Sequence, residues 1–547
     1  MSLGGRGTRG RLDGRSAGLG AVAGVLAAGA ALGAGQFVAG LTGASGSPVV
    51  VVGELQIDFT PPWLKNFAIS EFGADDKLVL VSGILVVLGA FAAVIGAAAT
   101  RRMAYGMAGV AVFAVVGLTA AATRPDATVA SLLPTLAATA SAVAVLQLLI
   151  PMVRSPAIPA SPAVSYDPVT ADPVTVPAKA EEPAETGPEG PEGPRRRRFL
   201  AAGAATAGVA AGAGLAGRLL TERSSVTNAQ KSLRIPRPTV TTQALPPGTD
   251  LHIPGLASFV TPNGSFYRVD TALVLPQVDP SSWQLRIHGM VSREITLTFD
   301  QLIKRPLIED YITLCCVSNP VDGPYIGNAK WLGASLAAVL REAGIKTGAD
   351  QLLCTSVDGF TSGTPVQTVM DGRDALLAVA MNGQPLPVAH GFPARMVVPG
   401  LYGYVSATKW VTDIEVTTFA GNYAYWAQRG WSQQAPIKTE CRIDVPNGLA
   451  EIRAGTTAVA GVAWAQHKGI EAVEVRVDGG PWQQARLAAV PGLDTWRQWV
   501  WEWQAASGGH TLEARAIDKT GYTQTSVLAP PEPNGATGYP MVSVAVR

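Results

Sequence analysis

Charged residues are scarce in this chain of 547 residues: only 15% are Asp, Glu, Lys or Arg, whereas 48% are hydrophobic. The 42 basic and 41 acidic residues leave a formal net charge of +1, which favours no polyanionic partner, so nucleic-acid binding is not expected. The excess of apolar residues lies almost wholly before residue 220. We therefore expect an N-terminal membrane half and a C-terminal globular half.

Several catalytic signatures are absent. The sequence contains no GxSxG elbow, no HExxH helix, no P-loop and no CxxC pair, which argues against hydrolase and zinc-site functions. A GxGxxG spacing does occur at Gly212, Gly214 and Gly217, but it lies inside an apolar stretch and follows no strand. We interpret it as a helix-packing surface of small residues and not as a dinucleotide site.

Four apolar segments are long enough to span a membrane, at residues 18–41, 78–100, 103–123 and 127–152. Arginines precede the first segment, join the second to the third and follow the fourth, at Arg6, Arg9, Arg11, Arg15, Arg101, Arg102 and Arg154. The positive-inside rule assigns these ends to the cytoplasm. Residues 1–154 are thus predicted to form four transmembrane helices, and the region 43–77 to form an outer loop.

Residues 155–198 are rich in Pro, Ala and Glu and end in four arginines, which predicts a disordered cytoplasmic linker. Residues 199–220 form an Ala/Gly-rich stretch that is either a fifth transmembrane helix or a signal-like segment. Four arginines followed by Phe-Leu resemble a twin-arginine translocation signal, and a plain positive-inside anchor is the alternative. Either reading places the rest of the chain outside the cytoplasmic membrane, as part of a multi-pass membrane protein.

Strand and helix patterns interleave irregularly at 240–435, which predicts an α+β domain with strands at WQLRIHG, EITLTF and KWVTDIEVTTF and a short helix at 333–341. Residues 440–547 instead contain short alternating strands, and Asp478 with Gly479 forms a hairpin signal. About seven such strands predict an immunoglobulin-like β-sandwich. Trp499, Trp501 and Trp503 fall on one face of a strand and are expected in the core or at an interface.

Cys315 and Cys316 end an apolar, strand-like run and precede a loop rich in Gly, Asn and Pro. A vicinal pair rarely closes a relaxed disulfide, so alternation along the strand predicts one exposed thiolate and one core residue. Thiolate is a soft metal ligand, and His390, Arg395 and Lys409 could hold an anionic cofactor. From the residues alone, two buried cysteines without chemistry remain the alternative.

Five stretches in this order resemble the sulfite oxidase superfamily of molybdopterin enzymes over residues 250–545: TPNGSFYR, TLCCVSN with IGNAKW, MNGQPLPVAHGFPARMVVPGLYGYVSATKW, RGWSQQAPIKT and GGHTLEARAIDKTGYTQ. The resemblance implies that Cys316 is the catalytic molybdenum ligand, beside a single pterin dithiolene. It also implies that oxygen-atom or electron transfer takes place at one molybdenum centre, which changes between the Mo(IV) and Mo(VI) states. The residues implied to bind the pterin are Asn263, Phe266, Tyr267, Ser356, His390, Arg395, Ser406, Thr408 and Lys409.

Two departures from the sulfite oxidase pattern bear on the substrate. Sulfite oxidases carry an arginine soon after the cysteine motif, where this chain continues with Asn319, Pro320, Val321 and Asp322, and a tyrosine before MNG, where it has 378–380, AVA. We therefore expect a sulfoxide or another small oxoanion as substrate. True sulfite oxidation is one alternative, and a non-catalytic extracytoplasmic interaction module is another. The layout is nearer to the bacterial periplasmic branch, whose members include a protein-methionine-sulfoxide reductase.

The expected partners follow from the same resemblance. No haem or flavin is expected, so a separate membrane or soluble carrier must exchange the electrons. The family's second domain is a dimerisation module, which makes a homodimer through 440–547 one expectation. The apolar spans contain no histidine for a haem, which favours simple anchoring over an electron conduit. Asp322 and Lys330 are expected at the surface, and the alternative is that they set the polarity of the substrate site. Cys354 and Cys441 are either isolated core thiols or a disulfide.

Overall fold

The computed structural model describes residues 14–42, 47–60, 76–124, 127–154, 192–223, 226–448 and 450–547. The chain divides into two compact units, Met1–Thr123 with Ala127–Ser224, and Arg124–Asp126 with Ser225–Arg547. The predicted linker lies outside the described residues except for its last seven positions, 192–198.

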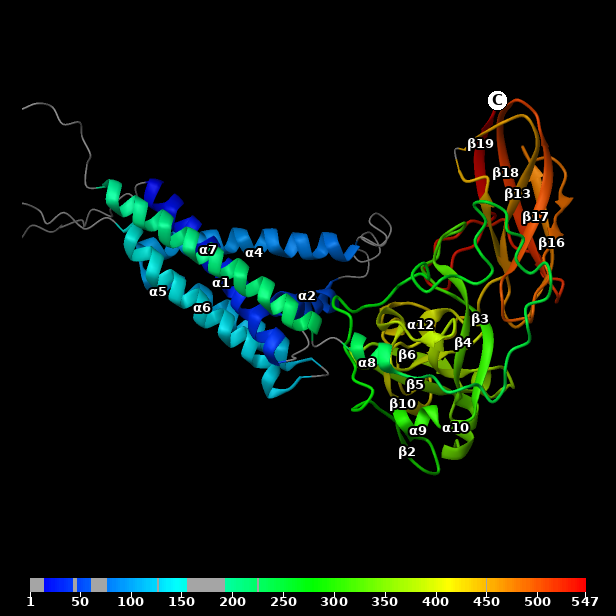
Figure 1. Ribbon diagram of the computed structural model, residues 1–547, viewed down its shortest axis with the longest axis horizontal. Coiled ribbons are helices and arrows are strands. Elements are labelled where there is room, and N and C mark those ends of the chain that lie inside the picture. Colours follow the sequence, from blue (N-terminus) through cyan, green and yellow to red (C-terminus); the bar gives the residue numbers. More distant parts are fainter. Residues whose placement is uncertain are drawn as a thin grey trace, which may run out of the picture. The chain divides into compact units, whose positions relative to one another are not determined.

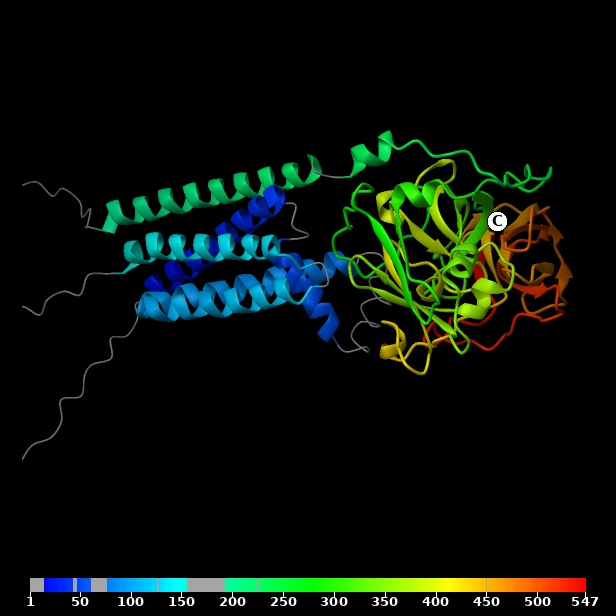
Figure 2. The ribbon, with the colours of Figure 1, turned by 90° about the horizontal axis from the view of Figure 1, so that it is seen from below.

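Helices make up the described part of the first unit and run side by side (Figures 1 and 2). They are α1 (Gly14–Thr42), α2 (Pro48–Phe59), α4 (Asp76–Arg101), α5 (Met103–Ala122), α6 (Val129–Val153) and α7 (Glu192–Arg223). Five of them are long and apolar enough to cross a membrane, at Ser16–Thr42, Val79–Arg101, Met103–Ala122, Val129–Val153 and Arg197–Thr221. This finding confirms the helical character of all five predicted segments.

Small residues let α1 approach its neighbours closely. A Cβ atom added at Gly24 would meet the backbone of Ala92 on α4, and one added at Gly217 would meet Gln36 on α1. Gly217 belongs to the GxGxxG spacing, which therefore lies on a helix and contributes to helix packing. The interpretation of that motif as a packing surface is confirmed for this glycine.

The helical unit differs from the sequence prediction at two points. The region expected as an outer loop contains helix α2, whose Val51 packs with Ala120 and Ala121 of α5. With only 12 residues, this apolar run is too short to count as a membrane span. Helix α7 begins at Glu192, so the end of the predicted linker, with its arginine cluster, is helical.

The first part of the second unit is an α+β domain, coloured green to yellow in Figure 1. One sheet has the order β2-β1-β10-β5-β6, and another has the order β3-β4-β7-β8 with β9 paired to β7. The strands are β1 (Gln284–Gly289), β2 (Ile295–Thr298), β3 (Leu307–Cys315), β4 (Ile326–Ser335), β5 (Gln351–Ser356), β6 (Thr361–Pro365), β7 (Leu376–Met381), β8 (Gln384–Pro385), β9 (Arg395–Val397) and β10 (Val411–Thr417). Its helices are α8 (Thr227–Ser232), α9 (Phe299–Ile303), α10 (Leu336–Ala343), α11 (Val366–Met370), α12 (Gly403–Ser406), η2 (Val388–His390) and η3 (Ala427–Arg429).

The predicted helix at 333–341 begins too early. Strand β4 continues through Gly333 to Ser335, because this stretch pairs with β7 and is buried there. The hydroxyl of Ser335 then caps helix α10 by accepting a hydrogen bond from the N–H of Ala338 at 3.2 Å. The helix ends at Ala343, and Gly344, whose φ is 71°, forms the left-handed cap that follows it.

The C-terminal part is rich in β-structure and contains two sheets, ordered β11-β13-β17-β16 and β12-β19-β18-β14-β15 (Figure 1). Its strands are β11 (Glu440–Val445), β12 (Glu451–Ile452), β13 (Gly455–Trp464), β14 (Ile470–Val477), β15 (Gln483–Gln484), β16 (Arg486–Leu487), β17 (Arg497–Ala505), β18 (Gly508–Asp518) and β19 (Met541–Val546). Residues of both sheets share one apolar core, which includes Trp499 and Trp503 and against which Trp501 packs. Asp478 and Gly479 have φ values of 49° and 70° and connect the paired strands β14 and β15, as the hairpin signal predicts.

Candidate functional site

The two adjacent cysteines lie at the end of strand β3. Cys315 is the last strand residue, is 0% exposed within the main core and donates a hydrogen bond from Sγ to the carbonyl of Cys316 at 3.4 Å. Cys316 is 8% exposed, so it is buried where the sequence predicts an exposed thiolate. The reason is the following loop, which folds back so that the N–H of Cys316 donates to the carbonyl of Tyr325 at 2.9 Å.

The surroundings of the two thiols differ. Burial raises the pKa of Cys316, but the N–H and hydroxyl of Ser318, the charge of Lys409 and the N–H of Val317 act in the opposite direction. Burial raises the pKa of Cys315 far above its ordinary value, and the nearby Glu440 raises it further. Cys316 is therefore better placed than Cys315 to carry negative charge as a metal ligand.

The loop after the cysteines is tied down by its own side chains. The N–H of Tyr325 donates to Oδ1 of Asn319 at 2.7 Å. Asp322, expected at the surface, is half-buried and accepts a hydrogen bond from the N–H of Ile443 at 2.9 Å. Lys330 forms an ion pair with Glu309 at 2.8 Å. Neither Asp322 nor Lys330 is thus a freely solvated surface charge.

Two neighbouring aromatic residues precede this domain's first strand and pack beneath β4. Phe266 is 6% exposed and meets the rings of Trp331 and His390 edge-on at 5.8 and 5.5 Å. Tyr267 stacks on Phe266 with the ring centroids 5.2 Å apart. Burial, together with the nearby cysteines, raises the pKa of Tyr267 well above its ordinary value, so its phenol stays neutral.

His390 lies at the end of η2 and contacts the segment that carries Asn263. Its Nε2 is 3.1 Å from the carbonyl oxygen of Asn263, which can only accept, so we assign the proton to Nε2 and leave Nδ1 as an acceptor. Burial, and then the charges of Arg395 and Lys409, lower the pKa of His390 to about 4. The side chain of Asn263 is itself fixed by the amide of Asn382, which donates to Oδ1 at 2.8 Å.

Arg395 is a buried cation whose hydrogen-bond partners are neutral. It is 5% exposed and donates to the carbonyls of Met396, His390 and Ala407 at 3.3, 3.1 and 3.1 Å. Its guanidinium lies 5.1 Å from the ring centre of Trp331. Among the described residues no carboxylate pairs with Arg395, and burial lowers its pKa to about 10. Two of its five N–H donors therefore stay available for an anion.

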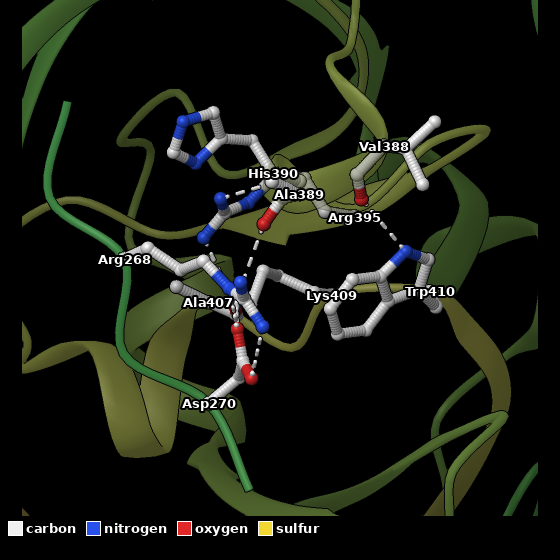
Figure 3. A network of polar contacts seen from close by, with 9 residues as sticks. All are labelled: Arg268, Asp270, Val388, Ala389, His390, Arg395, Ala407, Lys409 and Trp410. Atoms are coloured by element: carbon white, nitrogen blue, oxygen red, sulfur yellow. Dashed lines mark hydrogen bonds and ion pairs between the residues drawn. The ribbon is translucent and has the colours of Figure 1, made fainter. Parts of the chain in front are cut away.

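Lys409 is paired, which the sequence alone does not reveal. Its Nζ lies 2.6 Å from Oδ2 of Asp270 and donates to the carbonyl of Ala389 at 3.3 Å (Figure 3). Arg268 binds the same carboxylate, from Nε at 2.8 Å and from Nη2 at 3.3 Å. Burial lowers the pKa of Lys409 to about 8, although Asp270 opposes this shift.

Figure 3 shows Arg268, Arg395 and Lys409 gathered near Asp270. Asp270 binds Arg268 and Lys409, and no other carboxylate is bonded to any of these three cations in the part of the chain that the structure describes. The cluster therefore contains three cations and the single carboxylate of Asp270, and His390 is neutral. A partly buried cluster of this kind favours binding of an anion.

The three predicted hydroxyl residues take different positions. Ser406 is fully buried in α12 and its hydroxyl bonds to the carbonyls of Leu401 and Tyr402, both at 3.1 Å. The hydroxyl of Thr408 lies 2.5 Å from that of Ser362. Ser356 ends β5 opposite Val411, and its buried Oγ has no hydrogen-bond partner among the described residues. Among the described residues, Ser356 is thus the one of the three whose hydroxyl has no hydrogen-bond partner.

Sequence reasoning missed four residues that shape this cluster: Arg268, Asp270, Trp331 and Asn382. Arg268 and Trp331 stand within quoted motif stretches, so their positions next to Tyr267 and Lys330 were an available signal. Asp270 is 139 residues away from Lys409, and no local pattern links the two. In the described residues, no group of three or more His, Cys, Asp or Glu side chains could hold a metal ion by itself.

Comparisons with known proteins identify molybdopterin-dependent oxidoreductases as relatives of this chain. A family model described as "Oxidoreductase molybdopterin binding domain" matches residues 272–426. Sulfite oxidase of Gallus gallus is 30% identical over 325 residues, which cover 50% of this chain and 69% of that protein. Mitochondrial sulfite oxidase of Mus musculus is 29% identical over 323 residues, which cover 50% of this chain and 58% of that protein.

Among solved structures, the sulfane dehydrogenase SoxCD from Paracoccus pantotrophus matches 49% of this chain and 75% of its own with 24% identity and a TM-score of 0.44. The chain spans 58% of the length of the mouse relative and leaves the remainder unmatched. The matched region contains Cys316, His390, Arg395 and Lys409. This chain belongs to the sulfite oxidase superfamily of molybdopterin-dependent oxidoreductases.

Proposed function

We propose that this protein is a membrane-anchored oxidoreductase that catalyses oxygen-atom or electron transfer on a small oxidised substrate, with Cys316 as the protein ligand of molybdenum. Molybdenum held by one pterin dithiolene supplies the redox chemistry, and the protein supplies binding, orientation and electrostatics. Without any other cluster of metal-ligating side chains among the described residues, a metal at Cys316 requires ligands from a cofactor. A dithiolene meets that requirement, because it brings its own sulfur ligands.

The observation that carries this proposal is the buried Arg395, which has no carboxylate partner among the described residues. A buried arginine without a carboxylate partner is costly unless an anion completes its environment. Its guanidinium, with the neighbouring charges of Arg268 and Lys409, suits the phosphate of a pterin cofactor. Ser356 and Asn319 add two buried polar atoms, Oγ and Nδ2, that lack partners within the described chain. The available donors therefore fit an anionic, polar cofactor.

The remaining side chains would orient this group and not react with it. His390 is neutral and presents Nδ1 as an acceptor, while its Nε2 proton is held by the carbonyl of Asn263. Phe266 and Tyr267 form an apolar wall in which Tyr267 stays protonated. The carboxylate of Asp270 restricts the motion of Lys409, so the charge of Lys409 keeps one position.

The chemistry of the site favours a small oxidised substrate such as a sulfoxide or an oxoanion. Residues 317–329 contain no basic side chain, and Asp322 is turned toward Ile443. On β7, Ala378, Val379 and Ala380 are at most 1% exposed and offer no hydroxyl. Arg268, whose side chain is 38% exposed, is the cation best placed to meet an incoming substrate.

We infer that the five apolar helices anchor the protein in the cytoplasmic membrane and that the domain after residue 220 is extracytoplasmic, reached through a twin-arginine signal or a plain anchor helix. The arginine positions and the five candidate spans support this topology. The two C-terminal sheets over one core support an immunoglobulin-like sandwich. From the family resemblance, we also propose that this sandwich mediates a homodimer. A separate carrier would exchange electrons with the site.

The proposal is tested on the full-length protein purified in detergent. Molybdenum and pterin are measured first, and then turnover of sulfoxides with an artificial electron donor and of sulfite with an artificial acceptor. Cys316→Ser should abolish turnover, because it removes the metal ligand, whereas Cys315→Ser should keep most of it, because Cys315 fills the core.

Each result has a distinct meaning. Absence of molybdenum, tungsten and pterin would overturn the proposal. Equal loss of turnover in both serine variants would contradict the assigned roles of the two cysteines. A full complement of molybdenum without response to any donor or acceptor would favour the non-catalytic interaction module.

A further inference from the structure

Two segments that carry proposed site residues are hydrogen-bonded to the C-terminal part of the chain. One is the loop Cys316–Tyr325, and the other is the stretch 257–263, which ends at Asn263. Each segment is joined to β11 or to the region around β17 by hydrogen bonds between a backbone group of one partner and a side chain of the other. These contacts join residues that lie more than 100 positions apart in the sequence.

The cysteine loop is bonded to the edge strand β11. Because β11 borders its sheet, no described strand pairs with its outer side to satisfy the backbone groups there. Asp322 covers this edge by accepting the N–H of Ile443 at 2.9 Å. Arg442 donates from Nη1 to the carbonyl of Gly323 at 3.0 Å. The loop is thus held at two consecutive residues by two consecutive residues of β11.

The same arginine connects to the second segment. Nε of Arg442 binds Oδ1 of Asp444 at 2.6 Å, and both side chains are nearly buried, at 12% and 9% exposure. The other oxygen of Asp444 accepts the N–H of Ala257 at 3.0 Å. Arg442 and Asp444 therefore form one bridge that touches both segments at once.

Residues around β17 complete the attachment. Gln498, which is fully buried, donates to the carbonyl of Ala257 at 2.7 Å. The indole N–H of Trp496 donates to the carbonyl of Phe259 at 2.8 Å, and its backbone N–H donates to Oγ1 of Thr313 on β3 at 2.7 Å. Thr313 lies two residues before Cys315. The strand that ends in the cysteines is therefore anchored to the C-terminal part as well.

We propose that the C-terminal β-sheets position the metal-ligand loop and the segment of Asn263, with Asp322, Arg442 and Asp444 as positioning residues. This role is additional to any part the sheets play in dimerisation. An effect of these residues on the metal rests on the proposed role of Cys316 as its ligand. Their effect on the mobility of the loop does not depend on that role.

The backbone of Asp322 provides a sharp test. Its φ of 64° lies in the left-handed region, which Gly and Asn adopt most readily. Asp322→Gly keeps that conformation and removes only the acceptor, whereas Asp322→Asn keeps both. Arg442→Lys removes the planar fork that binds Gly323 and Asp444 together. Arg476→Ala is the matched control, since it breaks a 2.6 Å ion pair with Glu513 in the other sheet.

The measurements are hydrogen–deuterium exchange of peptides covering Cys316–Tyr325 and 257–263, and the electron paramagnetic resonance signal of the partly reduced metal, both on the full-length protein in detergent. We expect about fivefold faster exchange in the cysteine loop for Asp322→Gly and Arg442→Lys, as loss of one net hydrogen bond predicts. The resonance signal should shift at equal metal content. Asp322→Asn and Arg476→Ala should match the parent protein in both measurements.

The inference is overturned if Asp322→Gly and Arg442→Lys leave both measurements unchanged, or if Arg476→Ala alters them equally. Should Asp322→Gly not fold, Arg442→Lys carries the same test. A protein without molybdenum would contradict the proposed function, and the exchange data would still decide whether the sheets hold the loop.

Discussion

Glu440 is a single residue whose environment opposes its charge. It begins β11, is 6% exposed, and its Oε1 has no hydrogen-bond partner within the described chain. It lies opposite Trp464, whose indole N–H also lacks a partner, so the two side chains share one face of the sheet. Burial raises the pKa of Glu440 to about 8, and the charge of Lys438 opposes this shift. The carboxyl group is therefore largely protonated at neutral pH.

We predict that Glu440→Gln changes how stability depends on pH. The pKa of Glu440 is about 8 in the folded protein and 4.5 ordinarily. The parent protein therefore has its full stability below pH 4.5, where the carboxyl is protonated in both the folded and the unfolded state, and loses stability as the pH rises through 8. Glutamine keeps the shape and cannot ionise. The variant should therefore gain on the parent protein between about pH 5 and pH 8, by a few kcal/mol at about 1.4 kcal/mol per pKa unit. Thermal unfolding of the detergent-solubilised protein at several pH values measures this gain.

Glu502→Gln, at an exposed position on β17, serves as the control for this experiment. Its unfolding temperature should follow that of the parent protein across the whole pH range. A constant difference between Glu440→Gln and the parent protein at every pH would contradict the prediction.

Among the elements, β4 links strand β3, which ends at Cys315, to the apolar wall of Phe266 and Tyr267. Its Gly327 pairs with Leu314 of β3, and a Cβ atom there would lie 2.8 Å from Cε2 of Phe266. The ring of Phe266 can therefore rest directly on the strand backbone. In the next position, Asn328 binds the carbonyl of Phe259 and Oγ1 of Thr313 at 2.9 and 3.0 Å. One strand thus positions both the apolar wall and the segment that leads to Asn263.

We predict that Gly327→Ala displaces Phe266 and lowers the free energy of unfolding by about 1–3 kcal/mol, the usual effect of overpacking a core. Loss of cofactor content should accompany the change, because Phe266 supports Tyr267 and His390. Thermal unfolding and pterin content are the measurements. Gly509→Ala on β18, where an added Cβ meets nothing within 4 Å, is the control and should leave both unchanged. Equal effects of the two substitutions would argue against the role of Gly327.

For the whole molecule, the distribution of cysteines permits a test of topology. All four native cysteines lie between residues 315 and 441 and are buried, so the helical unit provides a cysteine-free background. The arginines predict that the turn between α4 and α5 is cytoplasmic and that the end of α5 is external.

In intact cells, a membrane-impermeant maleimide should label Thr123→Cys and leave Arg102→Cys unlabelled. After permeabilisation it should label both. Labelling of Arg102→Cys in intact cells, without labelling of Thr123→Cys, would reverse the proposed orientation of the protein.

Local patterns were sufficient for much of the fold. Apolar length predicted the five long helices, alternation predicted β1, β10 and the C-terminal strands, and Asp478 with Gly479 predicted a hairpin. Patterns were insufficient where a short element is stabilised by its neighbours, as with α2 against α5. The same reason explains the late start of α10, since pairing with β7 extends β4 through Gly333.

By itself, the sequence determined which residues are available for chemistry: a vicinal cysteine pair after a strand, a histidine and two basic residues within 20 positions, and motif stretches typical of one superfamily. Only the tertiary structure decided how they are used. It paired Lys409 with Asp270, left Arg395 without a carboxylate partner among the described residues, buried Cys316 and turned Asp322 toward β11. Periodicity reports on neighbours along the chain, whereas charge pairing and burial depend on distances that exist only after distant segments have packed.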